Sequence, residues 1–171
     1  DFSPICYKIC QRSHIQYLAS KYSMNINFKF PKTDVLCYEE SDKCKIVKSI
    51  CLATAELIDL PENLTVEFVN MAKNQYADSS LDNTNTNLIR MSLSLTINDL
   101  MIPLVHELIH VNQMHEGKLM ITEDGIFIWN MQTYELIIAD LPYEEYLMLP
   151  WEADVRHRQP KLLQEILKSY K

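Results

Sequence analysis

Two histidines four positions apart, with a glutamate directly after the first, form the pattern in this sequence that is most typical of chemistry. They are His106, Glu107 and His110. If the segment is a helix, positions four apart lie one turn apart on one face, so both imidazoles can reach the same metal ion. Histidines with this spacing hold zinc in hydrolytic sites, and the intervening glutamate activates a water. We therefore predict a metal site with Glu107 as the general base.

The surroundings of the motif favour the same interpretation. It lies in an otherwise apolar run from Leu100 to Val111, which would by itself predict a buried helix. Burying two imidazoles and a carboxylate costs several kcal/mol unless they are paired or ligated. A helix whose polar groups are satisfied by hydrogen bonds is the plainer alternative, and metal binding is the prediction that we favour.

A hydrolytic zinc site needs a third protein ligand and an open position. An extension of the motif along the helix would need glycine at 113 and histidine at 116, where this chain has Gln113 and Glu116. His115 is one position short, so we expect it to pack or to face solvent. Glu123 lies at the tip of a predicted hairpin, which argues against it as a ligand.

Glu152 is the better candidate for the third ligand. It follows Pro150 and Trp151, so we expect it in the first turn of a new helix, where a large buried neighbour can aim it rigidly across a cleft. An acidic residue that only complements the helix dipole is the alternative. We predict that His106, His110 and Glu152 hold one zinc ion per chain.

The region from about residue 88 to 158 resembles compact gluzincin-like zinc metallopeptidases, which phages and plasmids often encode. The resemblance rests on the pattern H-E-x-x-H, G-K-L, W-x4-Y and Y-x3-P-W-E, carried here by His106–His110, Gly117–Leu119, Trp129, Tyr134, Tyr146 and Pro150–Glu152. It implies zinc ligands His106, His110 and Glu152 and the catalytic base Glu107. The chain departs from the pattern at Asp154, where such families often have glutamate. Since Asp154 points away from Glu152 on a helix, we do not expect it to support the metal.

Alternation, capping residues and turn signals predict the elements that must position these side chains. Asp124-Gly125 favours a tight hairpin turn, and Gly117 favours the end of the motif helix. Pro103 indicates that this helix begins late or is kinked. The predicted elements are a helix at 3–22, strands at 25–30, 65–71 and 89–95, a helix at 43–59, a hairpin at 118–122 and 126–130, and a helix at 150–158 that continues, separately or kinked, to 169.

These elements predict an α+β fold, a single zincin-like domain with a small twisted sheet. It would comprise an N-terminal helix and strands in 1–73, a mobile loop at 74–87 and a catalytic core at 88–158. The segment 74–87 is rich in Asn, Asp, Ser and Thr, which predicts the loop. The length of 171 residues and a hydrophobic content of 47% suit one domain with a real core.

The charge and hydropathy of the chain exclude several classes. A net charge of −7 argues against a nucleic-acid partner, and the basic cluster Arg156 to Lys161 is typical of the polar face of a helix. No run approaches the roughly 18–20 apolar residues that span a bilayer. We expect a monomer in the cytoplasm, in a bacterial host if the chain is phage- or plasmid-encoded, that acts on a peptide or protein.

Five cysteines form an odd set without a C-x-x-C pair, which suits reduced thiols in a core better than a disulfide framework. A bridge between Cys37 and Cys44 stays open. The cysteines are at positions 6, 10, 37, 44 and 51.

The predicted reaction is hydrolysis of peptide bonds, and it needs a donor for the developing oxyanion. Tyr134, Tyr143, Tyr146 and His157 are candidates among which the sequence does not choose. A substrate could add as a strand along residues 88–95 if that strand is a sheet edge.

Three other functions compete with this prediction. The main alternative is a non-catalytic zincin-like binding or structural module that retains the metal. An intact Glu107 favours the enzyme, because a module without chemistry needs no base between its ligands. A peptide deformylase would need an upstream cysteine motif that the chain lacks, and a DNA-associated metalloprotease is disfavoured by the acidity.

Overall fold

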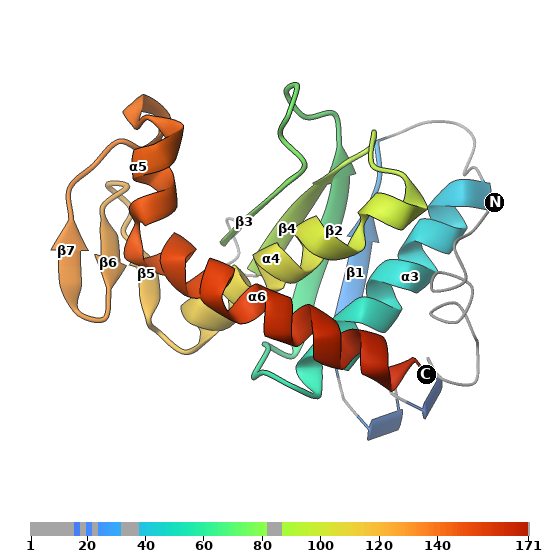
Figure 1. The fold of residues 1–171 in the computed structure, drawn as a ribbon. Helices are drawn as coiled ribbons and strands as arrows, with labels where there is room; N and C mark the ends of the chain where they lie inside the picture. Colours follow the sequence, from blue (N-terminus) through green and yellow to red (C-terminus); the bar gives the residue numbers. More distant parts are fainter. Residues whose placement is uncertain (1–15, 18–19, 22–23, 32–37, 82–86, 171) are drawn as a thin grey trace.

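The computed structural model describes residues 16–17, 20–21, 24–31, 38–81 and 87–170. The chain forms an α+β fold in which a four-stranded sheet is covered on one side by helices, with a smaller three-stranded sheet beyond the end of α4 (Figure 1). The helix predicted at 3–22 falls largely outside the described residues. None of the helices in the described part is long and apolar enough to cross a membrane.

The larger sheet has the strand order β1-β2-β4-β3. The first three strands are parallel and β3 is antiparallel to β4. Helix α3 connects β1 to β2, as a parallel pair requires. The strands and this helix are β1 (Asn25–Lys29), β2 (Asn63–Val69), β3 (Ala77–Leu81), β4 (Asn87–Ser92) and α3 (Tyr38–Ala55).

The segment 74–87, predicted to be a mobile loop, instead contains β3. This strand pairs with β4 from Ala77 opposite Met91 to Leu81 opposite Asn87. Its sequence has little intrinsic preference for a strand, so the prediction failed because pairing with β4 overrides local propensity. Residues 82–86 lie outside the described part of the chain.

The strand order also corrects the predicted place of a substrate. β4 lies between β2 and β3, so both of its sides are already paired, and the prediction that a peptide adds along residues 88–95 is wrong. The edge next to the motif helix belongs to β3, which contacts α4. A strand at an edge presents unpaired N–H and C=O groups that another chain can use.

Helix α4 (Met101–His115) carries the H-E-x-x-H motif and follows the short helix η1 (Ile97–Asp99). The helix does not begin late at Pro103, because its first turn already includes this residue. Proline lacks an N–H, but the first N–H that the helix needs is that of Leu104, which donates to the main-chain oxygen of Leu100. The helix ends as predicted at Gly117, whose φ of +69° is the left-handed conformation that favours glycine at this point.

Beyond α4 the predicted hairpin forms, with Gly125 in its turn, and a third short strand extends it. The last helix runs unbroken through Pro160, so the alternative of two separate helices is wrong. The elements are β5 (Leu119–Ile121), β6 (Phe127–Trp129), β7 (Gln132–Tyr134), η2 (Ile138–Asp140), α5 (Tyr143–Met148) and α6 (Pro150–Ser169).

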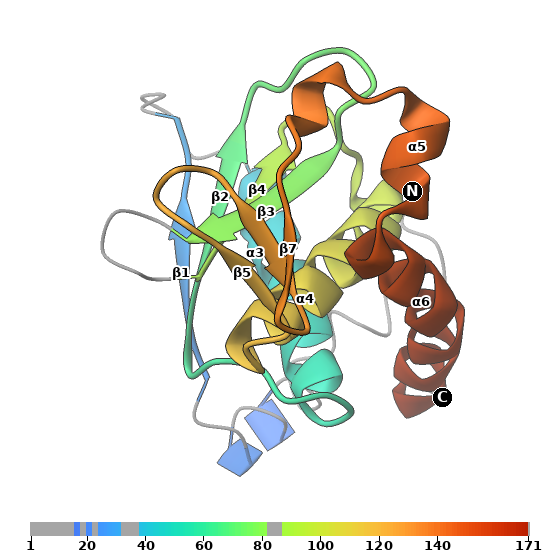
Figure 2. The same ribbon diagram turned by 90° about the vertical axis from the view of Figure 1, so that its left-hand side faces the viewer.

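The main core lies between the larger sheet and the helices. Alternate residues of β2 point inward, and they meet the apolar faces of α3 and α4. Figure 2 shows α4 between this sheet and α6, which covers its outer side. Cys51 is buried in this core as predicted, whereas Cys6, Cys10 and Cys37 lie outside the described residues. The apolar face of α4 therefore fixes the helix, and its other face is left for the motif.

Candidate metal centre

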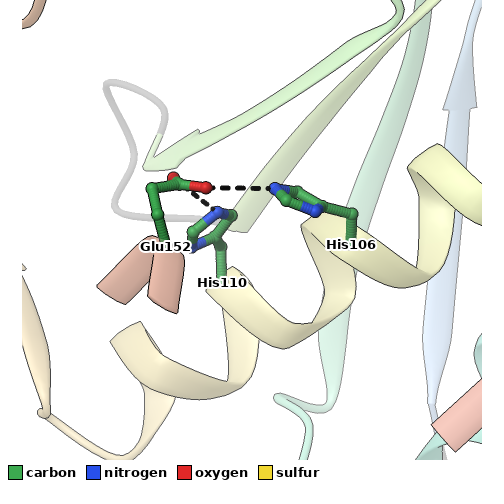
Figure 3. Close-up of side chains that lie close together, drawn as sticks. All are labelled: His106, His110 and Glu152. Atoms are coloured by element: carbon green, nitrogen blue, oxygen red, sulfur yellow. Dashed lines mark ion pairs between the residues drawn. The ribbon is translucent and has the colours of Figure 1, made fainter. Parts of the chain in front are cut away.

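The structure brings the three predicted ligands together from two helices. His106 and His110 project from α4, and Glu152 projects from the first turn of α6 (Figure 3). His110 Nε2 lies 3.1 Å from Glu152 Oε1, and His106 Nε2 lies 3.4 Å from Glu152 Oε2. One ligand atom from each residue falls within 4.8 Å of the others, which is compact enough for a single metal ion.

The start of α6 explains why Glu152 is so well placed. Pro150 occupies the first helical position, where its missing N–H is not needed. Trp151 is only 2% exposed and anchors this turn in the smaller core. The next residue, Glu152, is therefore held rigidly and faces α4.

One oxygen of Glu152 has no hydrogen-bond partner. Glu152 is 2% exposed, and Tyr146 donates its hydroxyl proton to Oε1 over 2.7 Å. Oε2, which faces His106, is the sole buried side-chain oxygen or nitrogen without a hydrogen bond in the described part of the chain. Such an atom is costly to leave unsatisfied, and a cation at this point would satisfy it.

Gln113 determines which nitrogen of His110 carries the proton. Gln113 Nε2 donates to the main-chain oxygen of Trp151 over 3.0 Å and to Asp154 Oδ2 over 2.8 Å. Its Oε1 therefore faces His110 Nδ1, at 2.9 Å. Because an amide oxygen can only accept, Nδ1 carries a proton, which leaves Nε2, the nitrogen that faces Glu152, as the one available to a metal.

Gln159 orients His106 in the same way from the third turn of α6. Its Nε2 donates to the main-chain oxygen of Ile102 over 2.8 Å, which leaves Oε1 facing His106 Nδ1 at 3.3 Å. His106 Nε2 is then also the ring nitrogen that faces the carboxylate and is available to a metal. Two imidazole lone pairs and a carboxylate converging on one point fit a divalent cation such as zinc.

The charges around the cluster favour positive charge at this point. Burial lowers the pKa of His110, but the carboxylates of Glu152 and Glu107 outweigh burial, so the pKa lies above its ordinary value. Burial raises the pKa of Glu152, but the two histidines that face it and the hydroxyl of Tyr146 leave it well below its usual range. Glu152 is thus an anion ready to bind a cation.

Glu107 lies beside the cluster without belonging to it. It is 8% exposed, and burial raises the pKa of its carboxyl, partly opposed by His110 and by a hydrogen bond from the side chain of Ser79 on β3. A carboxylate whose proton affinity is raised is better suited to take a proton from water. This position and environment agree with the predicted role of a general base.

Asp154 belongs to a hydrogen-bond network beside the cluster. Its carboxylate accepts from Gln113, and Arg158 Nη1 holds it from the other side at 3.2 Å. Arg158 also bonds to the buried Asn112, so the network extends back to α4. Asp154 does point away from Glu152, but it reaches His110 through Gln113. The expectation that Asp154 does not support the metal stays a prediction.

Sequence reasoning missed Gln113 and Gln159 as supporting residues. The signal was present, since Gln113 follows His110 by three residues and therefore shares its face of the helix. Gln159 follows Glu152 by seven residues, two turns along the same face of α6. What the sequence could not show is that α6 docks alongside α4.

The structure separates the four candidates for an oxyanion donor. Tyr146 bonds to Glu152, and Tyr143 lines the same cavity. Tyr134 instead packs edge-on against Trp151, with ring centres 5.4 Å apart. His157 lines a different hollow, between α6 and the end of α3. Tyr146 is the candidate closest to the ligands.

The residues that the sequence analysis rejected as ligands lie outside the cluster of His106, His110 and Glu152. His115 is partly exposed, with Nε2 3.6 Å from Asp59, as expected of a surface residue. Glu116 pairs with Lys118 at 2.6 Å. Glu123 is exposed in the turn between β5 and β6.

Two cavities meet at the cluster and together form a cleft along β3. The larger has a volume of about 720 Å³ and the smaller about 410 Å³. Glu107, Tyr146 and Glu152 line both cavities, as do Gln75 and Ala77 at the start of β3. An extended chain in this cleft would pass the cluster and lie next to the edge strand.

The chain matches no protein-family model, and neither the curated proteins nor the solved structures give a significant match. The resemblance to gluzincin-like peptidases therefore stays a prediction that rests on this chain's own residues.

Proposed function

We propose that the protein is a zinc-dependent peptidase with a zincin-like fold, in which His106, His110 and Glu152 hold the metal and Glu107 is the general base. One observation carries the proposal: ligand atoms of His106, His110 and Glu152 lie within 4.8 Å of one another, and the buried Glu152 Oε2 among them has no hydrogen-bond partner, beside the buried Glu107. Bound zinc supplies Lewis acidity, polarising a carbonyl and lowering the pKa of a water to about 7.

Glu107 moves the proton in the proposed reaction. Its buried carboxylate takes a proton from the attacking water and delivers it to the leaving amine. Ser79 on β3 hydrogen-bonds to the carboxylate, which restricts its orientation. Tyr146, whose hydroxyl proton is donated to Glu152 Oε1 in the structure, would turn this proton to the oxyanion that forms on the substrate carbonyl when Glu152 holds the metal.

The edge strand β3 positions the substrate in this proposal. An extended peptide adds to the free edge of β3 by main-chain hydrogen bonds, and its side chains alternate between the two cavities and solvent. Among the described residues that line the cleft there is neither lysine nor arginine to hold a terminal carboxylate. An internal peptide bond suits this cleft.

The test begins with the zinc content of the chain, purified without a metal-affinity step and measured by elemental mass spectrometry. We expect about one zinc ion per chain. Hydrolysis of an unfolded protein such as casein is then followed by mass spectrometry. The variant Glu107→Gln should keep zinc and lose about 10²–10⁴-fold in rate, while Glu123→Gln, an exposed glutamate of the hairpin turn, should match the parent.

Two results would refute the peptidase. A zinc-free chain that takes up no zinc when it is offered would mean that the cluster is not a metal site. Zinc binding with no hydrolysis would favour the non-catalytic binding module instead, and hydrolysis unchanged in Glu107→Gln would mean that Glu107 is not the general base of this reaction.

A further inference from the structure

The smaller cavity of the cleft is apolar on the side away from β3. Its wall comes from the end of α4 and from the segments that follow, so it is built by the small sheet and η2 rather than by the larger sheet. The residues of this wall are Met114, Leu119, Ile121, Phe127, Ile138 and Trp151. We call the cavity with this wall the apolar pocket.

Aromatic stacking fixes the apolar pocket relative to the metal ligands. Phe127 stacks on Trp151 with ring centres 5.1 Å apart and planes at 12°, and Tyr134 closes the other side of this tryptophan. Leu119 is 5% exposed and packs in the same cluster. Because Trp151 directly precedes Glu152, the pocket wall and the third ligand belong to one rigid unit.

The charges at the apolar pocket disfavour a charged occupant. Glu107 and Glu152 belong to the catalytic site, and their negative charge opposes an acidic side chain. The remaining carboxylate, Asp78, is already paired with Arg90 through two bonds of 2.8 and 2.9 Å. A basic side chain would thus lose hydration in the pocket without gaining a free anion of its own.

The two cavities differ in the polarity of their walls, so the two ends of the cleft are not equivalent for a bound peptide. The larger cavity has several polar side chains on its walls, including Asn74, Ser94 and Asp99, whereas the smaller has the apolar wall. A volume of about 410 Å³ lies within the roughly 300–1,000 Å³ usual for binding pockets. The smaller cavity can therefore accept one large side chain next to the cluster.

We infer that the apolar pocket is the specificity site of this protein and takes a large apolar side chain, such as that of Leu, Met or Phe, from the residue adjoining the cleaved bond. The inference rests on the proposed function, since it names the substrate that the peptidase selects. It assigns the small sheet β5-β6-β7 a role in substrate choice, beside its packing against Trp151.

The test uses the full chain loaded with zinc and a mixture of synthetic peptides with varied sequence, with the cleavage positions read by mass spectrometry. We expect large apolar residues to be enriched at one fixed position beside the cleaved bond. In Ile121→Lys the cleavage of a preferred peptide should fall at least about tenfold, in line with the 10–200-fold that a hydrophobic contact contributes to discrimination. Zinc content should be unchanged.

Met131→Lys is the matched control, because Met131 is 86% exposed on the same sheet and lines neither cavity. A second pair of variants keeps the test valid if Ile121→Lys does not fold. Ile138→Ala enlarges the pocket and should raise the relative cleavage of peptides with the bulkiest side chains. Ile137→Ala, at an exposed neighbour outside the pocket, should leave the preference unchanged.

The outcomes separate the inference from the proposed function. Cleavage without an apolar preference, or with one that neither Ile121→Lys nor Ile138→Ala alters, overturns the inference and leaves the peptidase standing. A preference for charged side chains beside the cleaved bond overturns it as well. If the zinc-loaded chain cuts no peptide at all, the proposed function fails and the inference fails with it.

Discussion

Replacing Gln113 with leucine removes the residue that orients His110 while keeping a side chain of similar size. Gln113 is completely buried and makes three hydrogen bonds, to His110, Trp151 and Asp154. Asp154 retains Arg158 as a partner in the variant, so its carboxylate is not left alone. The group that loses its partner is His110 Nδ1–H, and the imidazole is then free to rotate.

This variant separates the effect on metal binding from the effect on folding. Loss of a partner to a metal-binding histidine typically costs 10–100-fold in metal affinity, which is about 1.4–2.7 kcal/mol. The buried donor that is left unsatisfied lowers the free energy of unfolding of the metal-free chain by about 1–3 kcal/mol. We therefore expect a folded protein that binds zinc about 10–100-fold more weakly.

Zinc affinity is measured by competition with a chromophoric chelator at fixed pH, and stability by urea unfolding of the metal-free chain. Gln159→Leu is the matched variant on the other ligand. Its bond to His106 is longer, at 3.3 Å, and Gln159 is only partly buried, so its loss in zinc affinity should be smaller. The reasoning is refuted if Gln113→Leu binds zinc within about twofold of the parent, or if Gln159→Leu loses more affinity than Gln113→Leu.

Further predictions concern the metal, the site and the fold. Zinc at 1,000 times its dissociation constant should stabilise the parent by about 4 kcal/mol in calorimetry, and Glu152→Ala should abolish this gain. Tyr146→Phe should retain zinc and lose about 10²–10³-fold in kcat, and an unchanged kcat would exclude it as the oxyanion donor. Gly117→Ala should lower the free energy of unfolding by roughly 1–2 kcal/mol, because a left-handed residue gains a β-carbon there; a Cβ meets no atom within 4 Å, so a larger loss would contradict this cause. Burial raises the pKa of the Cys51 thiol to about 12, so the folded chain favours the protonated thiol. The free energy of unfolding should therefore decline as the pH rises above about 9, the ordinary thiol value, where the unfolded chain loses this proton. Alkylation of Cys51 in the native state at pH 8 would refute its burial.

The grouping of His106, His110 and Glu152 could be predicted from the sequence because each lies at a position with a defined direction. His106 and His110 share a helix face by spacing alone, and Glu152 lies in a first turn that Pro150 starts. Local signals also placed Gly117 and the hairpin turn correctly. These features depend on neighbours within one or two turns, which a sequence displays directly.

The features that failed depend on contacts between distant segments. β3 is polar and gains its structure from β4, so nothing local distinguished it from a loop. Gln113 and Gln159 resemble ordinary polar helix residues until α6 is docked on α4. The prediction that a substrate adds along residues 88–95 was wrong for the same reason. Because β3 was not predicted, β4 was taken for an edge strand, whereas β3 forms that edge of the sheet.

The three candidate ligands come from two helices that the small sheet separates in the chain, so a bound metal would link α4 to α6. Any opening that lifts the first turn of α6 also removes a ligand, so zinc occupancy raises the free energy of that opening. In the metal-free chain, the turn around Trp151 should exchange its amide hydrogens faster and be cut sooner by added proteases. The proposed pocket, whose wall includes Trp151, would then be fully ordered only when the zinc concentration around the protein is high enough to fill the site.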